Sequence, residues 1–205
     1  YGDSQETESL EPHFTGALLK LSTFIERVTD PDGAWGEGLG YNNYSFHTLC
    51  QSLPALERVF GVDLSGPLNG SWREMVWAGP VKDRRCFYFG DTGGRLNPIT
   101  NWAWLVPKYS DPLLGWLYDF LSEGPLESNT QASMTGYMNL INKKNESFMD
   151  VLFETEQTPR RNPFGDNPVK CFRKIGTTVF KSGWEKDDFI FVMRTGPFFN
   201  HQHLD

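Results

Sequence analysis

Apolar residues recur with helical spacing in the first third of the chain. Residues 12–28 carry apolar side chains at i, i+3, i+4 and i+7 with polar residues between them, which predicts a helix packed on one side. A second helical pattern runs over residues 44–60, although Pro54 must kink this helix or begin a new one. Breakers at residues 30–33 and the glycine-rich stretch before Tyr41 predict a loop between the two. We therefore expect a unit of helix, loop and helix.

A short helical candidate, a clear helix and a weaker helical pattern follow. Residues 71–77 form a short helical candidate. The Ser-Asp-Pro sequence at residues 110–112 is a favourable helix start, and the apolar stripe behind it extends to Leu121. A weaker helical pattern covers residues 131–142. We expect the polar, proline-containing stretch 154–168 to be a linker.

The pattern becomes extended after this linker. Residues 171–180 and 188–193 favour β-strands, and a turn at residues 182–187 joins them into an antiparallel hairpin. The second of these segments, DFIFVM, is rich in β-branched and aromatic residues, which predicts a buried strand. We therefore place a domain boundary here, with a helical domain at residues 1–165 and the start of a β domain at residues 166–205.

Composition places the chain among globular proteins and limits its partners. Of its 205 residues, 39% are hydrophobic and 15% aromatic, enough for the core of one or two domains. A formal net charge of −7 argues against nucleic-acid binding, but local basic clusters such as Arg160 and Arg161 are compatible with an anionic substrate. No apolar run approaches the roughly 18 residues of a membrane span. The three cysteines lack CxxC spacing, so we interpret them as ordinary thiols.

Two of the four histidines lie one residue apart near the end of the chain. In an extended segment His201, His203 and Asp205 would share one face, with the two imidazoles roughly 7 Å apart. Two imidazoles and a carboxylate on one face suit metal binding or proton transfer. The alternative is a strand end with solvated polar residues, because an HxH motif alone is weak. Since the chain stops at Asp205 directly after a strand, we expect the protein to continue.

Three stretches, in this order along the chain, are similar to those of a known family. They are DGAWGEGLGYNNYSF at residues 32–46, GTTVFKSGWEKDDFIFVMRTGP at residues 176–197 and NHQHLD at residues 200–205. Together they resemble the heparinase II/III-like polysaccharide lyases, whose chains pair an incomplete α/α toroid with a C-terminal antiparallel β-sandwich. The resemblance implies that residues 1–165 are the C-terminal part of the toroid. Residues 166–205 would be the start of the sandwich.

The resemblance also implies roles for particular residues. The family's catalytic tyrosine follows an EGxGY loop and matches Tyr41, with Tyr44 as the alternative. Its catalytic histidine is the first of the HxH pair and matches His201. The second, His203, matches a ligand of a metal that is usually zinc. Zinc needs about four ligands, so we expect the remaining ligands beyond Asp205. Asp205 itself is either a ligand or a carboxylate that orients a histidine.

The chemistry of elimination agrees with these residue types. Breaking a uronate chain across C4 and C5 removes a weakly acidic proton beside a carboxylate, so the carboxylate must be neutralised and a base must reach C5. Tyr41 lies in a glycine-flanked loop that a substrate can approach closely. Glu37 and Asn200 belong to the same motifs and are candidate substrate contacts. Trp102 is a third candidate substrate contact, because a tryptophan ring can stack on a sugar. The alternative is that Trp102 belongs to the core.

The resemblance, with which this chemistry agrees, implies a lyase that cleaves a glycosaminoglycan or alginate type of polysaccharide by β-elimination, with tyrosine and histidine as acid and base. Two alternatives stay open. A uronate C5-epimerase would use the same carbanion, and an inactive carbohydrate-binding protein would use the same scaffold. The partner is then an anionic polysaccharide or oligosaccharide, and its size implies a periplasmic or extracellular location.

Overall fold

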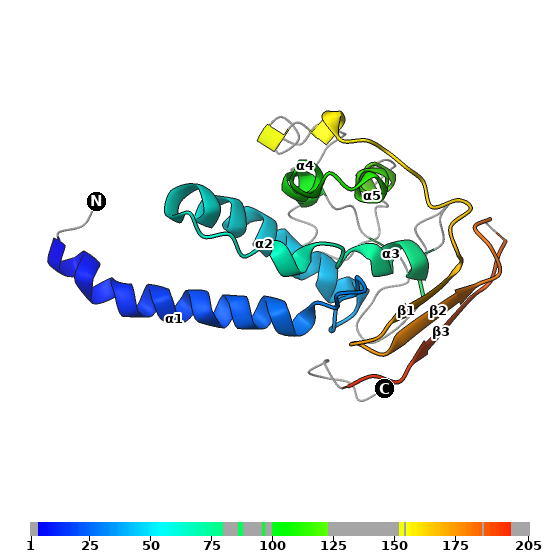
Figure 1. Cartoon of the computed structure of the whole chain (residues 1–205), viewed down its shortest axis with the longest axis horizontal. Coiled ribbons are helices and arrows are strands. Elements are labelled where there is room, and N and C mark those ends of the chain that lie inside the picture. The colour runs from blue at the N-terminus through cyan, green and yellow to red at the C-terminus, as the bar shows by residue number, and fades with distance from the viewer. Residues whose placement is uncertain are drawn as a thin grey trace, which may run out of the picture.

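The computed structural model describes residues 4–79, 86–87, 96, 100–122, 152–153, 155–185 and 187–197. Within these residues it contains five α-helices and a three-stranded antiparallel sheet, so the protein has mixed α and β structure. Figure 1 shows two long helices, α1 and α2, as neighbours, with the sheet at one end of the pair.

The first two helices confirm the predicted unit of helix, loop and helix. Helix α1 (Ser4–Val28) includes the predicted segment and begins earlier. Helix α2 (Leu39–Phe60) also begins earlier than predicted, and Pro54 lies inside it without dividing it. The early start of α2 places Tyr41 in the first helical turn, next to the loop.

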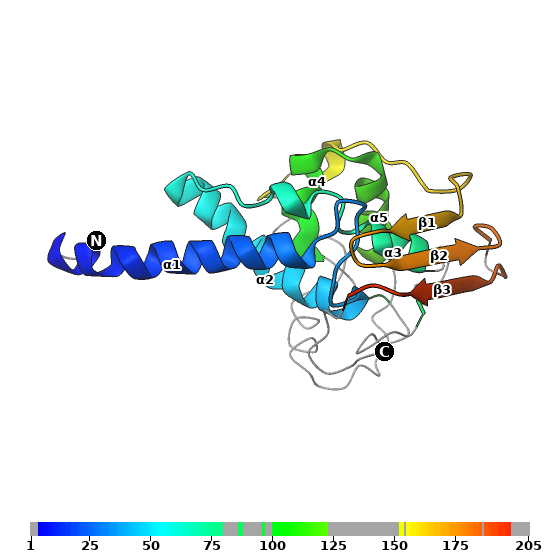
Figure 2. The same ribbon diagram turned by 60° about the horizontal axis from the view of Figure 1, so that its bottom comes forward.

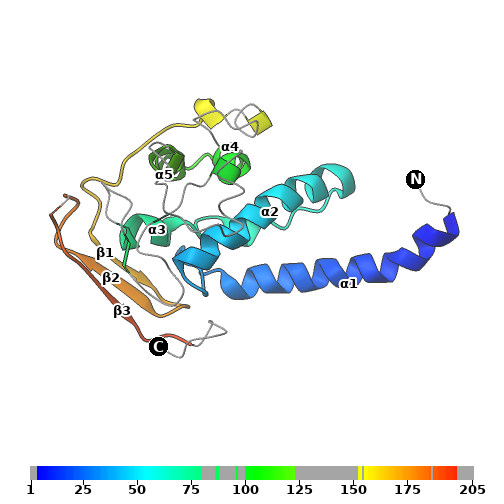
Figure 3. The same cartoon turned by 180° about the vertical axis from the view of Figure 1, so that it is seen from behind.

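The later helices are shorter. They are α3 (Arg73–Ala78), α4 (Leu105–Tyr109) and α5 (Pro112–Ser122), with 3₁₀ turns at Gly66–Leu68, Thr100–Trp104 and Thr155–Gln157. Helices α3 and α5 confirm two of the predictions. The carboxylate of Asp111 accepts hydrogen bonds from the backbone N–H groups of Leu113 at 2.8 Å and Leu114 at 3.4 Å, which caps α5 as its sequence predicts. Figure 3 shows α4 and α5 on the side of α2 and α3 that is away from α1. The predicted helix at residues 131–142 lies outside the described residues.

The sheet has three strands in the order β1-β2-β3, as Figure 2 shows. They are β1 (Val169–Phe172), β2 (Thr177–Lys181) and β3 (Ile190–Arg194), and each neighbouring pair is antiparallel. The predicted hairpin of β2 and β3 is confirmed. The predicted first strand at residues 171–180 is instead two strands, because a turn that ends at Gly176, with φ of 73°, reverses the chain between them.

One face of the sheet packs on the helices and the other faces outward. Phe172 and Val179 are fully buried on the inner face. On the outer face Phe180 lies opposite Phe191, and the Phe191 side chain is 55% exposed. The prediction that residues 188–193 form a buried strand is therefore wrong. Only alternate residues of β3 face the core, because the described part of the chain covers one side of this sheet.

Helix α3 joins the sheet to the helical part. The Lys181 ammonium, buried at the end of β2, donates hydrogen bonds to the carbonyl oxygens of Val76 at 3.1 Å and Gly79 at 2.5 Å, at the C-terminal end of α3. It also lies 4.4 Å from the centre of the Trp184 ring. A single hydrophobic core includes buried residues from before and after residue 165. The domain boundary at that point stays a prediction. No helix within the described residues is long and apolar enough to cross a membrane.

Candidate functional site

The glycine-rich loop (residues 33–38) connects α1 to α2 and is anchored in the core. Trp35 is fully buried, and its ring lies 5.4 Å from the ring of Phe46 on α2. The backbone N–H of Gly36 donates to the carbonyl oxygen of Val28 at the end of α1, at 2.7 Å. A buried tryptophan in the middle of the loop, with backbone bonds beside it, gives the loop a defined position between the two helices.

Two glycines of this loop adopt backbone angles that other residues seldom adopt. Gly33 has φ of 105°, and a Cβ atom there would collide with the carbonyl oxygen of Gly70. Gly38 has φ of 90° at the N-cap position of α2. The glycines therefore permit both the close approach of the loop to residue 70 and the sharp entry into α2.

The tyrosines and Glu37 lie at the start of α2 and in the loop that precedes it. Tyr41 is half-buried in the first turn and packs against the core. Tyr44 is 57% exposed and lies about one helical turn further along. Glu37 is partly exposed in the loop itself. Of the two tyrosines, Tyr41 is nearer to the loop along the chain and is the more firmly packed.

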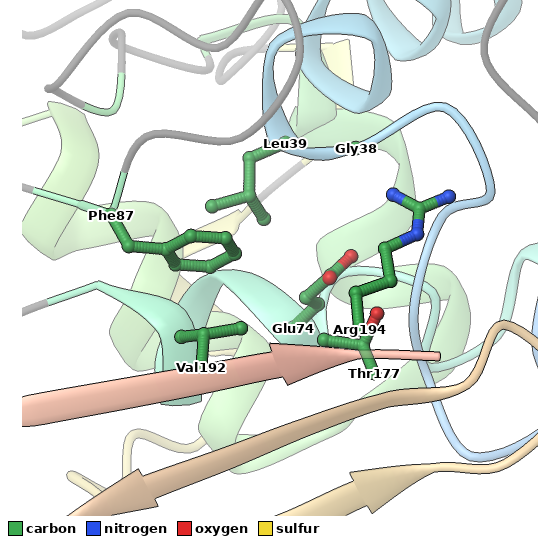
Figure 4. A pocket seen from close by; sticks show the side chains of 7 residues that line it. All are labelled: Gly38, Leu39, Glu74, Phe87, Thr177, Val192 and Arg194. Atoms are coloured by element: carbon green, nitrogen blue, oxygen red, sulfur yellow. The ribbon is translucent and has the colours of Figure 1, made fainter. Parts of the chain in front are cut away.

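Glu74 and Arg194 contact the glycine-rich loop from two other elements, and we call this pair the loop clamp. The backbone N–H of Glu74, in α3, donates to the carbonyl oxygen of Gly33 at 2.8 Å. Its side-chain Oε2 accepts a hydrogen bond from the backbone N–H of Trp35 at 3.2 Å. The guanidinium of Arg194, at the end of β3, donates to the carbonyl oxygen of Gly36 at 2.7 Å. Figure 4 shows the two side chains next to each other beneath the loop.

Burial controls the electrostatics of the clamp. The side chain of Glu74 is enclosed by protein, which raises the pKa of its carboxyl group to about 7. The hydrogen bond from Trp35 and the charge of Arg194 lower this pKa, whereas the carboxylate of Asp30 raises it further. The cavity beside Glu74 and Arg194 has a volume of about 10 Å³ and is also lined by Thr177. This is room for about one water molecule and not for a sugar.

The turn between β1 and β2 contacts the end of α1 and the residues that precede the loop. The guanidinium of Arg173 donates to both carboxylate oxygens of Asp32, at 2.8 and 2.9 Å, and this hydrogen bonding lowers the pKa of Asp32. The backbone N–H of Ile175 donates to the buried carboxylate of Asp30 at 2.9 Å. The Lys174 ammonium donates to carbonyl oxygens in the last turn of α1 and just beyond it. These two basic residues thus bind groups of the chain itself.

The residues directly after β3, which precede the NHQHLD motif at residues 200–205, lie against the same turn. The backbone N–H of Thr195 donates to the carbonyl oxygen of Gly176 at 2.9 Å. A Cβ atom on Gly196 would collide with the carbonyl group of Ile175, so only glycine allows this approach. The residues predicted to act from this motif, namely Asn200, His201, His203 and Asp205, lie outside the described residues.

Trp102 lies in the core and not on a surface. Its side chain is fully buried, and its ring centre lies 4.8 Å from that of Phe46. A sugar ring needs an exposed aromatic face, so we no longer assign Trp102 to substrate binding. Cys50 and Cys86 are buried free thiols, and Cys171 is an exposed one.

The described residues do not make a metal site by themselves. Among them, no three His, Cys, Asp or Glu side chains converge so that they could hold a metal ion. This gives no test of His203, which lies outside them.

The sequence analysis missed Glu74 and Arg194. The available signal for Glu74 was a carboxylate within the otherwise largely apolar run of residues 72–78. For Arg194 it was a cation that directly follows an apolar strand. Neither signal names a partner, because their loop contacts lie 39 and 158 positions away in the chain.

Comparison of the chain with protein-family models gives no match, and a search of curated proteins finds none either. What the protein does must therefore be argued from its own residues and from the likeness of its motifs.

Proposed function

We propose that this chain belongs to a polysaccharide lyase that cleaves a uronate-containing polysaccharide by β-elimination. On this proposal α1 to α5 are part of an incomplete α/α toroid, and β1 to β3 begin an antiparallel β-sandwich. The observation that carries the proposal is the contact between the end of β3 and the glycine-rich loop. The loop belongs to the stretch at residues 32–46 and the end of β3 to the stretch at residues 176–197, and both stretches resemble the heparinase II/III-like family.

This contact joins segments that are far apart in the sequence. Arg194 of β3 binds Gly36 across 158 positions, and β3 points toward the start of α2 in Figure 2. Tyr41 follows the loop on one side of the contact. The motif with His201 follows β3 on the other side. Neighbouring segments that lead to a tyrosine and to a histidine are what an acid and base pair at one substrate requires.

In the proposed reaction one of these two residues removes the proton at C5 of the uronate. The electron pair of the broken C–H bond forms the C4–C5 double bond, the bond from C4 to the bridging oxygen breaks, and the second residue protonates that oxygen. We assign these steps to Tyr41 and His201, with Tyr44 as the alternative to Tyr41. Glu37 and Asn200 are the proposed contacts to the sugar. The partial exposure of Tyr41 and Glu37 supports their access to a substrate.

We also propose that the natural protein binds zinc in a structural role through His203 and not through His201. Elemental analysis should then find metal in the His201→Ala variant and little in the His203→Ala variant. His203→Ala should also melt at a lower temperature, because a bound structural metal contributes to folding. Equal loss of metal in both variants contradicts this division of roles.

The absorbance of the products tests the proposed reaction. Incubation with glycosaminoglycans and with alginate should produce ultraviolet absorbance from the conjugated 4,5-unsaturated uronate. An epimerase would instead exchange the C5 proton with solvent without new absorbance, and a binding protein would do neither. Either of these outcomes contradicts the lyase proposal. Because the substrate is a large anionic polymer, we propose a periplasmic or extracellular location.

A further inference from the structure

We infer that the loop clamp, Glu74 and Arg194, positions Tyr41 relative to the segment that follows β3, by holding the glycine-rich loop between α3 and the sheet. The role given to Tyr41 rests on the proposed function, whereas the holding of the loop does not. Both clamp residues are positioning residues and not catalytic ones, since neither is placed to contact a substrate.

The contacts of Glu74 cover the first half of the loop. Its backbone N–H and its carboxylate bind Gly33 and Trp35, two residues apart, so one residue of α3 fixes both the path and the orientation of the loop. The Glu74 side chain is 3% exposed. Trp35 is itself fully buried, so a residue at position 74 without an acceptor would leave the backbone N–H of Trp35 without this protein partner.

Arg194 holds a later part of the loop from the sheet. It lies opposite Thr177 in the sheet, and its guanidinium reaches past Glu74 to the carbonyl oxygen of Gly36. Since Thr195 and Gly196 follow it directly, any displacement of the loop against Arg194 also changes the distance between the loop and these two residues. The clamp thus couples the loop before Tyr41 to the segment that begins after β3.

The size of the cavity decides between a positioning role and a binding role. A volume of about 10 Å³ accepts about one water molecule, so the cavity that the described residues form beside Glu74 is too small for a uronate. The charged groups that face Glu74 within the described residues are Asp30, from beyond the end of α1, and Arg194, from β3. Its carboxylate therefore acts on other protein groups, and through them on the loop.

A comparison of Glu74→Ala with Glu74→Gln in the natural protein tests this inference. The alanine variant removes the acceptor of the Trp35 N–H. The glutamine variant keeps an acceptor of the same shape and should restore the wild-type behaviour. Arg194→Met removes the hydrogen bond from the sheet to Gly36. Asp119→Asn is the matched control, because it breaks the surface ion pair with Arg160, far from the loop in the sequence.

The first readout is amide hydrogen exchange in peptides that cover the loop, which needs no substrate. Exchange should be faster in Glu74→Ala and Arg194→Met, near the wild-type rate in Glu74→Gln, and unchanged in Asp119→Asn. Unchanged exchange in both Glu74→Ala and Arg194→Met overturns the clamp, whatever the activity of the protein. Should Glu74→Ala fail to fold, Arg194→Met alone decides.

The second readout is the rate of uronate elimination. A loop displaced by about 1 Å can cost up to about 100-fold in rate, so kcat should fall roughly 10- to 100-fold in Glu74→Ala while KM changes little. Glu74→Gln should recover most of kcat. Faster loop exchange with full kcat overturns the positioning of Tyr41 but leaves the clamp intact. A protein without any elimination activity overturns the proposed function, and the exchange result still decides the clamp.

Discussion

The two ends of the α1 and α2 pair differ in how they are covered. At the loop end Ile25, Trp35 and Phe46 are buried almost completely. At the opposite end large apolar side chains are exposed, with Leu10 at 60% and Val59 at 68%. The same two helices are thus part of a core at one end and a largely open surface at the other. In Figure 1 the sheet and α3 lie at the loop end, and α1 extends away from them.

The difference shows that helical periodicity alone does not decide burial. The apolar stripe of α1 runs from Phe14 to Val28, but only Ile25 and Val28 in it are buried, whereas Phe14, which lies beside Phe60 of α2, is 37% exposed. At the loop end the turn between β1 and β2 binds the end of α1 through Lys174, and β3 binds the loop through Arg194. We therefore expect substitutions at the loop end to have large effects and those at the open end to have small ones.

The largest effect on stability should come from the loop tryptophan. Trp35→Ala deletes a fully buried ring, which typically costs about 3–5 kcal/mol of the free energy of unfolding. The control Val59→Ala changes an exposed side chain at the open end and should stay within about 0.5 kcal/mol. Denaturant titration of both variants checks this contrast. Similar losses in the two variants would show that the two ends do not differ in packing.

The next effect concerns pH and the buried carboxyl group of Glu74. Burial raises its pKa from 4.5 to about 7, so between these values the folded protein keeps a proton that the unfolded chain releases. The free energy of unfolding should therefore decrease as the pH rises through this window, by about 3 kcal/mol in all. Glu74→Gln should remove this contribution, which unfolding titrations of both proteins at pH 5 and pH 8 would measure. An identical pH dependence in the variant contradicts the assignment.

The smallest effect should come from the cation at the end of α1. Lys174 donates to two carbonyl oxygens there, one of them that of Thr29 at 2.6 Å. A cation at a helix C-terminus contributes about 0.3–1 kcal/mol. Lys174→Met should therefore lower the melting temperature slightly, whereas the control Lys20→Met, in the exposed part of α1, should not. Equal melting temperatures for the two variants would remove this contact from the account.

The parts of the fold that depend on local sequence could be predicted. The Ser-Asp-Pro start of α5 works through bonds to the next few residues, and the turn residues between β2 and β3 act in the same local way. The sequence pattern predicts a start of this helix at residue 44, but α2 begins at Leu39. The glycine-rich sequence up to Gly40 is typical of a loop and so gives no sign of this earlier start. The burial of β3 could not be read from an apolar run, since that pattern does not say how many sides of a strand are covered.

In the candidate site, too, local motifs could be predicted and contacts across the fold could not. The motifs propose Tyr41 and its loop as part of the site, and the structure describes the position of both. They do not identify Glu74 or Arg194, whose roles come only from contacts across the fold. Trp102 was a candidate substrate contact and is instead fully buried. The sequence alone does not distinguish a tryptophan of the core from one on a binding surface.

The most direct test of the account is the activity of Tyr41→Phe beside that of Tyr44→Phe. Tyr41→Phe removes one hydroxyl group and keeps a half-buried ring, so folding and substrate binding should change little. A group that transfers a proton in the transition state supplies a factor of about 10² to 10⁴, so elimination should fall by that factor. Tyr44→Phe should stay active. Loss of activity in Tyr44→Phe alone would move the role to that residue, and more than about a tenth of the activity in both variants would contradict tyrosine catalysis at this loop.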